Sequence, residues 1–437
     1  MRGILPRGPP FCNGAPVDAD GARGDNRPRL SAQPRPAMNL DIKKLDVLSD
    51  WMKRAAGRGE CAGVQAAVVK DGREVWYAAV GMADLGENRP MERDTIFRMF
   101  SSTKCVTGLA AAMCADRGIF ALRTPVYEFL PGFRDQCWWD GRELRRIGPG
   151  GRPVYLFDLL NMTSGITYTG DWDPGDRGRK RLIEEQQAEV DRGVYTGTVE
   201  LMNRMGAVPL SFFPGSRWAY GFNADVMAAV IEVATGKRYG QWLREEIFDP
   251  LGMVDTGFAV APEKRARMAT CYHCVPGEEG SPRPMPEVGR RIGLSDYVPE
   301  TGYEAGGAGL VSTIGDWCKL MAMLQAGGTY GGHRFLSPYG FRLMTTPMLT
   351  PEQAKTYNWQ DKLGNNYAFF NDVRIAGAPS SNPSNPGTFG WCGALGTNSF
   401  VDPVERLSLV VMIQNEPPFT TSTLTYGLRN PLYAALD

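Results

Sequence analysis

The chain has 437 residues, with 48 basic side chains, 48 acidic side chains and only 2 histidines. This length exceeds that of one hydrophobic core and predicts two lobes, while zero formal charge argues against a nucleic-acid partner. The two histidines, His273 and His333, rule out a multi-histidine metal centre, and any histidine-based triad must use one of them. We expect neither a metal nor a cofactor.

The first 37 residues contain 7 of the 32 prolines and no amphipathic period, which predicts a disordered arm. A helical pattern opens at Met38. The start of the chain lacks the continuous apolar stretch of a secretory signal, and the absence of any run of 18 apolar residues predicts no membrane span. The 9 cysteines are odd in number and scattered, a pattern typical of reduced thiols in a cytoplasmic protein.

Helix and strand patterns follow in order. An amphipathic helix is predicted at residues 40–56, and two apolar runs at residues 63–70 and 74–81 flank Asp71-Gly72, which is a hairpin signal. An alanine-rich helix follows Ser101 to Lys104. This alanine-rich helix covers residues 106–116. The later predicted elements are helices at residues 225–235 and 242–248, the last stopped before Pro250, and strands at residues 397–401 and 407–414.

Strands at both chain ends with helices between them predict an α+β fold. The two ends build one antiparallel sheet flanked by helices, and a mostly helical lobe is inserted between them. We place the α/β lobe at residues 38–125 and 300–437, and the inserted lobe at residues 126–299.

Ser101-x-x-Lys104 at the start of a helix is the unit that points to chemistry. Residues i and i+3 share a helix face, so the serine hydroxyl and the lysine amine can meet. The helix dipole favours an alkoxide-like oxygen, and burial together with this field lowers the pKa of an amine towards a basic role. The competing interpretation is a helix-capping serine followed by a solvated lysine, and the spacing alone does not separate the two.

Further segments extend this unit. The chain resembles the serine β-lactamase-like family, which includes class C β-lactamases, family VIII carboxylesterases and D-alanyl-D-alanine peptidases. The resemblance runs from about Met38 to the C-terminus and implies the β-lactamase/transpeptidase-like fold. It rests on residues 81–86 and 94–104, LLNMTSG at residues 159–165, YGFNADV at residues 220–226, PLGMVDT at residues 250–256, GGAGLVST at residues 306–313 and FGWCG at residues 389–393.

The resemblance implies a role for each matching residue. Ser101 is the expected nucleophile, and Lys104 either holds Tyr220 as a phenolate or itself accepts the serine proton. Tyr220 passes that proton to the leaving group. The backbone N–H groups of Ser101 and Ala394 form the expected oxyanion hole.

Two further positions are expected to contact the substrate. Gly393 allows its close approach. Asn223 is a weaker candidate, because Y-G-F-N is one residue longer than the family's Y-x-N.

The third motif separates the branches of the family. Lactamases and peptidases usually carry a cation where this chain has Trp391, and that cation binds the substrate carboxylate. An indole cannot pair with a carboxylate but can pack against an apolar acyl or alcohol group, so Trp391 is expected to contact the substrate. Phe213 is a further candidate for the wall of the acyl pocket, with core packing as the alternative.

We therefore predict a serine carboxylesterase that acts on a small-molecule ester through an acyl-enzyme. The alternatives are a β-lactamase or D-amino-acid peptidase, an acyltransferase that uses the same intermediate and, less favoured, a non-catalytic scaffold. The sequence leaves the oligomeric state open.

Overall fold

The computed structural model describes residues 37–295, 297, 302–358, 363–380, 382–416 and 427–437. The predicted disordered arm at residues 1–37 lies outside the described residues, apart from Ala37. The predicted lobe boundaries at residues 125/126 and 299/300 stay a prediction.

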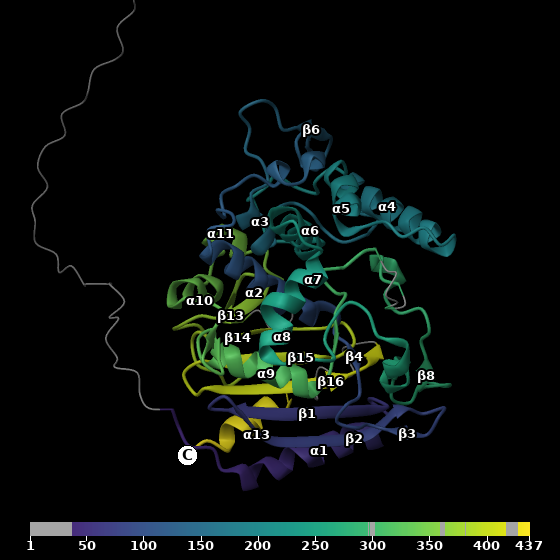
Figure 1. Cartoon of the computed structure of the whole chain (residues 1–437), viewed down its shortest axis with the longest axis vertical. Coiled ribbons are helices and arrows are strands. Elements are labelled where there is room, and N and C mark those ends of the chain that lie inside the picture. The colour runs from purple at the N-terminus through teal and green to yellow at the C-terminus, as the bar shows by residue number, and fades with distance from the viewer. Residues whose placement is uncertain (1–36, 296, 298–301, 359–362, 381, 417–426) are drawn as a thin grey trace, which may run out of the picture. The chain divides into compact units, whose positions relative to one another are not determined.

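An antiparallel sheet of eight strands joins the two ends of the chain, as the sequence predicts (Figure 1). Its order is β12-β13-β14-β15-β16-β1-β2-β3, so the N-terminal β1 pairs directly with the C-terminal β16. The bounds are β1(Gly63–Lys70), β2(Arg73–Asp84), β3(Arg89–Pro90), β12(Asn365–Ala368), β13(Asn371–Arg374), β14(Phe389–Cys392), β15(Asn398–Asp402) and β16(Leu407–Ile413).

Strand β1 is buried along its whole length because both faces of the sheet are covered. Its alternate residues divide between two cores: Val64, Ala66 and Val68 belong to one, and Ala67 and Val69 to the other. The predicted hairpin is confirmed by Asp71 and Gly72, which have φ values of 53° and 75° and so form a turn that suits the twist of the strands.

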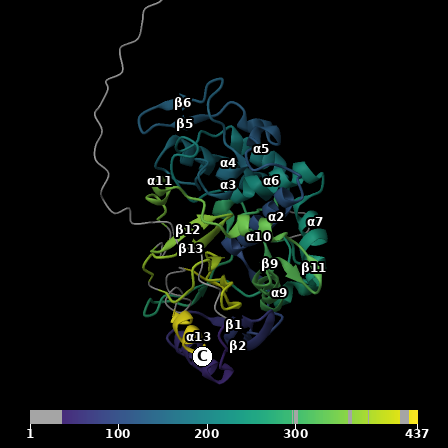
Figure 2. The same cartoon turned by 90° about the vertical axis from the view of Figure 1, so that its left-hand side faces the viewer.

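Helices cover the sheet on both sides. Helices α1(Asp46–Gly57) and α13(Arg429–Ala434) lie together against one face, and α9(Ile314–Gln325) lies against the other (Figures 1 and 2). The predicted helix at residues 40–56 is thus confirmed, with its first turn as the 3-10 helix Ile42–Leu45.

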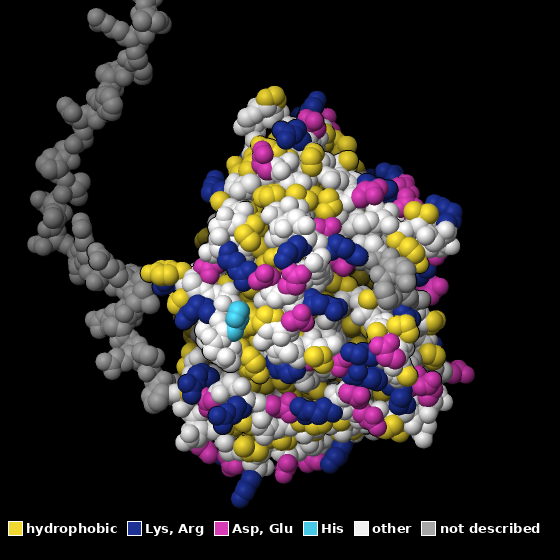
Figure 3. Space-filling model, viewed as in Figure 1, with side chains coloured by type: hydrophobic (Ala, Val, Ile, Leu, Met, Phe, Trp, Pro, Cys, Tyr) yellow, Lys and Arg dark blue, Asp and Glu magenta, His cyan; other side chains and the backbone are white. Residues whose placement is uncertain are grey.

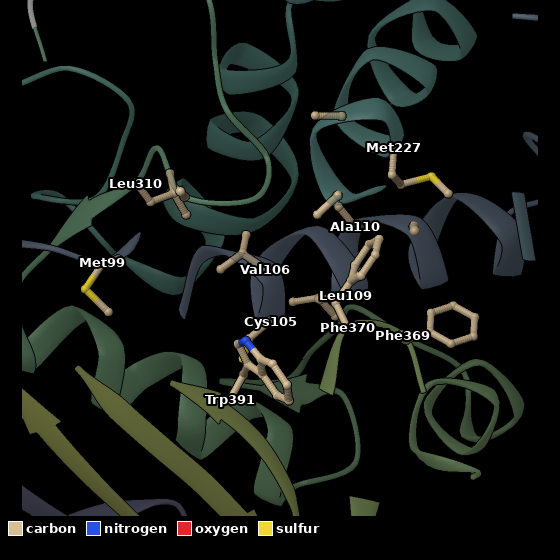
Figure 4. Packing of buried hydrophobic residues seen from close by; sticks show 14 of the residues in the cluster. Met99, Cys105, Val106, Leu109, Ala110, Met227, Leu310, Phe369, Phe370 and Trp391 are labelled. Atoms are coloured by element: carbon tan, nitrogen blue, oxygen red, sulfur yellow. The ribbon is translucent and has the colours of Figure 1, made fainter. Parts of the chain in front are cut away.

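Helix α2(Thr103–Asp116) stands between the sheet and the helices contributed by the middle of the chain (Figure 1). All of its residues from Thr103 to Cys114 are buried, and Val106, Leu109 and Ala110 pack among Met227, Leu310 and Phe370 (Figure 4). The surrounding helices are α3(Leu156–Leu160), α4(Pro174–Asp191), α5(Thr198–Gly206), α6(Asn223–Thr235), α7(Tyr239–Leu243), α8(Asp249–Leu251), α10(Pro338–Thr345) and α11(Pro351–Ala354).

Short strands and 3-10 turns complete the described part of the fold. The strands are β4(Phe97–Arg98), β5(Cys137–Trp139), β6(Leu144–Arg146), β7(Tyr272–His273), β8(Arg283–Pro284), β9(Val311–Ser312), β10(Thr329–Tyr330), β11(His333–Arg334) and β17(Asn415–Glu416). The 3-10 turns after the first are Phe100–Ser102, Val126–Glu128, Pro131–Phe133, Pro262–Arg267 and Arg290–Ile292.

One helix end differs from the prediction. The helix at residues 242–248 does not stop before Pro250, because a π-helical turn, Arg244–Phe248, leads directly into α8. Pro250 occupies the first turn of α8, where a missing N–H costs nothing, and Gly252 ends the helix in a left-handed conformation with φ 67°.

Basic and acidic side chains are interspersed over the face shown in Figure 3, as zero net charge requires. Across the part of the chain that the structure describes, no helix combines the length and the apolar character needed to cross a membrane. Within the same ranges, no cluster of three or more His, Cys, Asp or Glu side chains is arranged to hold a metal ion.

Candidate active site

Ser101 and Lys104 meet at the start of α2. The 3-10 turn Phe100–Ser102 runs into this helix, and Lys104 Nζ donates a hydrogen bond to Ser101 Oγ at 3.2 Å. Phe100 has a left-handed φ of 46°, an uncommon backbone conformation for a bulky residue, directly before the serine. The predicted i, i+3 contact is present, and it lies in the interior rather than on a solvated face.

Burial decides the charge state of Lys104. The side chain is fully buried, and its remaining contacts are the Gly307 carbonyl oxygen at 2.7 Å and the Tyr168 hydroxyl at 3.0 Å. Burial lowers the pKa of Lys104 to about 8, and the negative charge of Asp225 partly opposes this. Near neutral pH the amine therefore has an accessible unprotonated form, as a general base requires.

Tyr220 lies on the other side of the lysine. Lys104 Nζ is 4.7 Å from the centre of its ring, and Trp391 Nε1 donates a hydrogen bond to its hydroxyl at 3.0 Å. Burial raises the pKa of Tyr220 above its ordinary value, while hydrogen bonds with Ser101 and Trp391 act in the opposite direction. The free protein therefore holds Tyr220 as a phenol. Of the two predicted roles for Lys104, this favours direct acceptance of the serine proton.

Tyr168 is a functional residue that the sequence reasoning missed. Its hydroxyl accepts from Lys104 Nζ, and its ring packs edge-to-face on that of Tyr220 at 5.4 Å. Burial raises the pKa of Tyr168 well above its ordinary value, and a hydrogen bond with Ser101 opposes this. In the sequence it stands in a loop just after the matched segment at residues 159–165, and no spacing marks it.

Asn223 lies in the interior. Its side chain is fully buried. Its amide nitrogen donates to the Ile166 carbonyl oxygen at 2.9 Å, and its amide oxygen accepts from Ser164. Asn223 therefore ties the loop that carries Tyr168 to the segment that carries Tyr220, and its contact with substrate stays a prediction.

Trp391 is buried beside Tyr220, and its predicted contact with substrate stays a prediction. The indole is 3 % exposed and packs against Tyr220 and Tyr367, with ring centres 5.6 and 5.3 Å apart. Figure 4 shows it beneath α2 beside Cys105. Packed this way, Trp391 supports the tyrosine and presents little surface to an acyl group.

Gly393 lies tightly against the turn that leads to Ser101. A Cβ atom at this position would stand 2.3 Å from the Met99 carbonyl oxygen and 2.2 Å from Thr397 Oγ1. A side chain is therefore excluded, and the chain is drawn towards Ser101 just before Ala394, which is partly exposed. The oxyanion hole formed by Ser101 and Ala394 stays a prediction that this approach favours.

The other predicted residues lie further out. Phe213 is half-buried and packs on Trp138 of the β5–β6 hairpin, with ring centres 5.3 Å apart. His273 lies on β7, and its Nε2 contacts Glu278 at 3.1 Å. His333 is exposed on β11 beside Phe335. The structure thus assembles Ser101, Lys104 and Tyr220 without bringing either histidine to them.

A cavity of about 510 Å³ begins at Thr169, the residue after Tyr168. One wall is the loop of Thr169, Gly170 and Asp171, and the other is the facing side of α4. The lining mixes apolar and charged groups: Lys180, Ile183, Glu184, Gln187, Ala188, Asp191 and Arg290 complete it. The cavity therefore lies next to the loop that carries Tyr168, and its lining does not include Ser101, Lys104 or Tyr220.

The eight-stranded sheet stands beside a buried cluster of Ser101, Lys104 and Tyr220, and the sequence comparison assigns the chain to a family. The profile of the family described as Beta-lactamase matches residues 48–429. The chain belongs to this beta-lactamase family.

Relatives and solved structures extend this assignment. Protein Rv1367c of Mycobacterium tuberculosis (strain ATCC 25618 / H37Rv) is 30% identical over 408 residues, which cover 91% of this chain and 96% of that protein. Esterase EstB of Burkholderia gladioli is 28% identical over 425 residues, covering 91% and 97%.

Two solved structures share the fold. EstCE1, a hydrolase with promiscuous acyltransferase activity, has a TM-score of 0.69 at 23% identity, covering 90% of this chain and 99% of that one. Simvastatin synthase (LovD) from Aspergillus terreus has a TM-score of 0.72 at 22% identity, covering 90% and 98%.

Proposed function

We propose that this protein is a serine carboxylesterase that cleaves small carboxylic esters through an acyl-enzyme intermediate. The observation that carries the proposal is the contact between the buried Lys104 amine and Ser101 Oγ at 3.2 Å. A lysine with a pKa near 8 beside a hydroxyl at a helix start is a nucleophile–base pair that needs no histidine.

The first half-reaction forms the acyl-enzyme. The neutral Lys104 amine takes the proton of Ser101, and Oγ attacks the ester carbonyl carbon. The carbonyl electrons move onto oxygen, where the N–H groups of Ser101 and Ala394 stabilise the charge. When the carbonyl re-forms, the bond to the alcohol oxygen breaks, and that oxygen receives a proton from Lys104 by way of the Tyr220 or Tyr168 hydroxyl.

Water completes the cycle. It attacks the acyl carbon while the same groups remove its proton, and Ser101 leaves with a proton restored. The two tyrosines flank Lys104 and both form hydrogen bonds with Ser101, so either phenol can relay a proton between the lysine and an oxygen bound to the acyl carbon. Because these groups share one proton, they should titrate as a coupled unit.

Ester substrates are favoured over β-lactams and D-peptides by the third motif. Trp391 stands where lactamases and peptidases of this family carry a cation, and its buried indole donates to Tyr220 instead of meeting solvent. This position offers no positive charge to a substrate carboxylate. Esterase EstB, a relative aligned over 91% of the chain, supports the same choice because its name is that of an esterase.

Acyl transfer is the second candidate, since an alcohol can replace water in the second half-reaction. Its support is the name of a shorter match, Monacolin J acid methylbutanoyltransferase of Aspergillus terreus, which is 28% identical over 281 residues and 62% of this chain. Product analysis of an aryl ester incubated with and without a primary alcohol separates the two. A dominant new ester would favour transfer, and free acid would favour hydrolysis.

A paired assay with p-nitrophenyl butyrate and nitrocefin tests the proposed substrate class. We expect the ester to be turned over faster relative to its spontaneous hydrolysis, and Ser101→Ala to abolish the reaction with the fold intact. Faster relative turnover of nitrocefin would overturn the choice of esters.

We also propose a cytoplasmic location. Its support is the cysteine content, because no disulfide joins the eight cysteines in the described residues. Fractionation of cells that express the full chain tests this, and recovery from a secreted or periplasmic fraction would contradict it.

A further inference from the structure

The Gly307 carbonyl group controls how Lys104 faces Ser101. It accepts a hydrogen bond from Lys104 Nζ at 2.7 Å. A carbonyl oxygen can only accept, so this bond occupies one N–H whether the amine is neutral or protonated. The direction of the carbonyl therefore fixes where the other positions on Nζ point, including the lone pair of the neutral amine, which must face Ser101 or Tyr168.

Asp225 holds the Gly307 peptide in place. The Gly307 N–H donates to Asp225 Oδ1 at 3.0 Å, and the Tyr303 hydroxyl donates to the same oxygen at 2.8 Å. The carboxylate lies so close that a Cβ atom at residue 307 would stand 2.5 Å from Asp225 Oδ2. Gly307 thus contacts Asp225 through its N–H and Lys104 through its carbonyl, two groups of the consecutive peptide units that meet at its Cα.

The position of Asp225 on α6 has an ordinary explanation as well. Asp225 is the third residue of this helix, where the helix dipole stabilises a negatively charged side chain. That explanation does not require the contacts with Tyr303 and Gly307, which belong to a different segment of the chain. The Asp225 side chain is 2 % exposed and points at the segment that carries Tyr303 and Gly307.

The charges around the pair are few and buried. The Asp225 carboxylate raises the pKa of Lys104 against the larger effect of burial, and Lys104 in turn opposes the rise that burial causes in the pKa of Asp225. The other titratable groups that face one or the other are Ser101, Cys105, Tyr168, Tyr220, Tyr239, Tyr303 and Cys392. Hydroxyl and thiol groups of this kind are ordinarily neutral at neutral pH, so the Asp225 carboxylate is the ordinary source of negative charge here.

We propose that Asp225 is a positioning residue for the catalytic base: it holds Gly307 so that Lys104 faces Ser101, and it keeps a carboxylate close to that lysine. The inference rests on the proposed function, because it assigns Asp225 a part in activating Ser101. Asp225 does not touch the reacting atoms and acts through Gly307 and Lys104.

The test is the pH dependence of Ser101 activation in Asp225→Asn. The asparagine oxygen can still accept from Gly307 and Tyr303, but the charge is gone. Two rates are followed against pH: phosphonylation of Ser101 by a fluorophosphonate probe, and kcat/KM for p-nitrophenyl butyrate. We expect the midpoint of the rising limb to fall by about one pH unit in both, because removal of a nearby carboxylate favours the neutral amine.

Asp316→Asn is the matched control. Asp316 is also buried, at 4 % exposure, and pairs with Lys319 on α9, away from the site. It should leave the midpoint at the wild-type value, and thermal unfolding by circular dichroism checks that both variants fold. A smaller fall is expected in Tyr303→Phe, which removes one donor to the Asp225 carboxylate and so favours its neutral form.

An unchanged midpoint in folded Asp225→Asn would overturn the inference. If that variant does not fold, Tyr303→Phe decides: a lower midpoint supports the role of Asp225, and an unchanged one overturns it. Failure of the proposed function is recognised separately, because wild-type protein would then show neither ester turnover nor labelling of Ser101.

Discussion

Trp391 Nε1 lies 3.0 Å from the Tyr220 hydroxyl oxygen and donates a hydrogen bond to it. This contact links the segment FGWCG at residues 389–393 to the tyrosine of the segment YGFNADV at residues 220–226. It also places a neutral donor where other branches of the family have a cation. A neutral donor stabilises negative charge on the phenol oxygen without creating a binding site for a substrate carboxylate.

Trp391→Phe is expected to lower kcat/KM for an aryl ester by about 10- to 100-fold, because the ring packing remains while the hydrogen bond to the phenol is lost. Trp317→Phe is the matched control, since Trp317 Nε1 also makes a buried hydrogen bond, to Ser399 Oγ at 2.9 Å. Equal losses in the two variants would mean that Trp391 acts through stability alone.

Tyr168→Phe should reduce kcat/KM by about 100-fold, in the range typical of a lost proton-transfer group. The variant keeps the ring contact with Tyr220 but removes the hydroxyl that accepts from Lys104. Tyr239→Phe, at another fully buried tyrosine that contacts Thr107, controls for loss of a buried hydroxyl. Full activity in Tyr168→Phe would assign the proton relay to Tyr220 alone.

The rate should follow the neutral form of Lys104. Since burial lowers the pKa of this amine to about 8, kcat/KM should rise with pH around that value and fall below it as the amine becomes protonated. A stopped-flow pH profile for an ester with a pH-insensitive leaving group measures this. A flat profile between about pH 7 and 9 would exclude Lys104 as the titrating base.

The free energy of unfolding should also depend on pH through the titration of Lys104. The pKa of Lys104 is lower in the folded protein than its ordinary value of 10.5, so the unfolded chain binds more protons between the two values. The free energy of unfolding should therefore gain a contribution that grows as pH rises from about 8 to about 10. Urea unfolding of the wild type and of Lys104→Met across this range isolates it, because the variant lacks the titrating group.

Replacement of both histidines by glutamine should leave ester hydrolysis within about two-fold of the wild type, since surface substitutions away from a site have small effects. His273 contacts Glu278 and His333 packs beside Phe335. Steady-state assay of the double variant tests this, and a loss comparable to that of Lys104→Ala would contradict the lysine-based mechanism.

Much of this architecture follows from local patterns. The apolar runs that flank the Asp71-Gly72 turn predict the central hairpin, and the burial of β16 follows from its mostly apolar sequence. The short strands β12 and β13 lie in a polar segment without a period and were not predicted. β12 pairs with β13, and β13 in turn with β14, so their place in the sheet depends on neighbouring strands rather than on a pattern of their own.

The candidate site shows the same division. The i, i+3 spacing predicts the contact of Ser101 with Lys104 because one helix carries both. Tyr168 and Asp225 reach Lys104 through tertiary contacts from other segments, and no spacing in the sequence encodes that approach. Asn223 was assigned to substrate by analogy, whereas its complete burial follows from the packing of two loops.

Intact-mass measurement of the protein after brief exposure to an activated ester tests the central claim most directly. We predict that wild-type protein gains the mass of one acyl group, that peptide mapping places the group on Ser101, and that Ser101→Ala gains nothing. Turnover by Ser101→Ala at the wild-type rate, or an acyl group on another residue, would contradict the proposed mechanism.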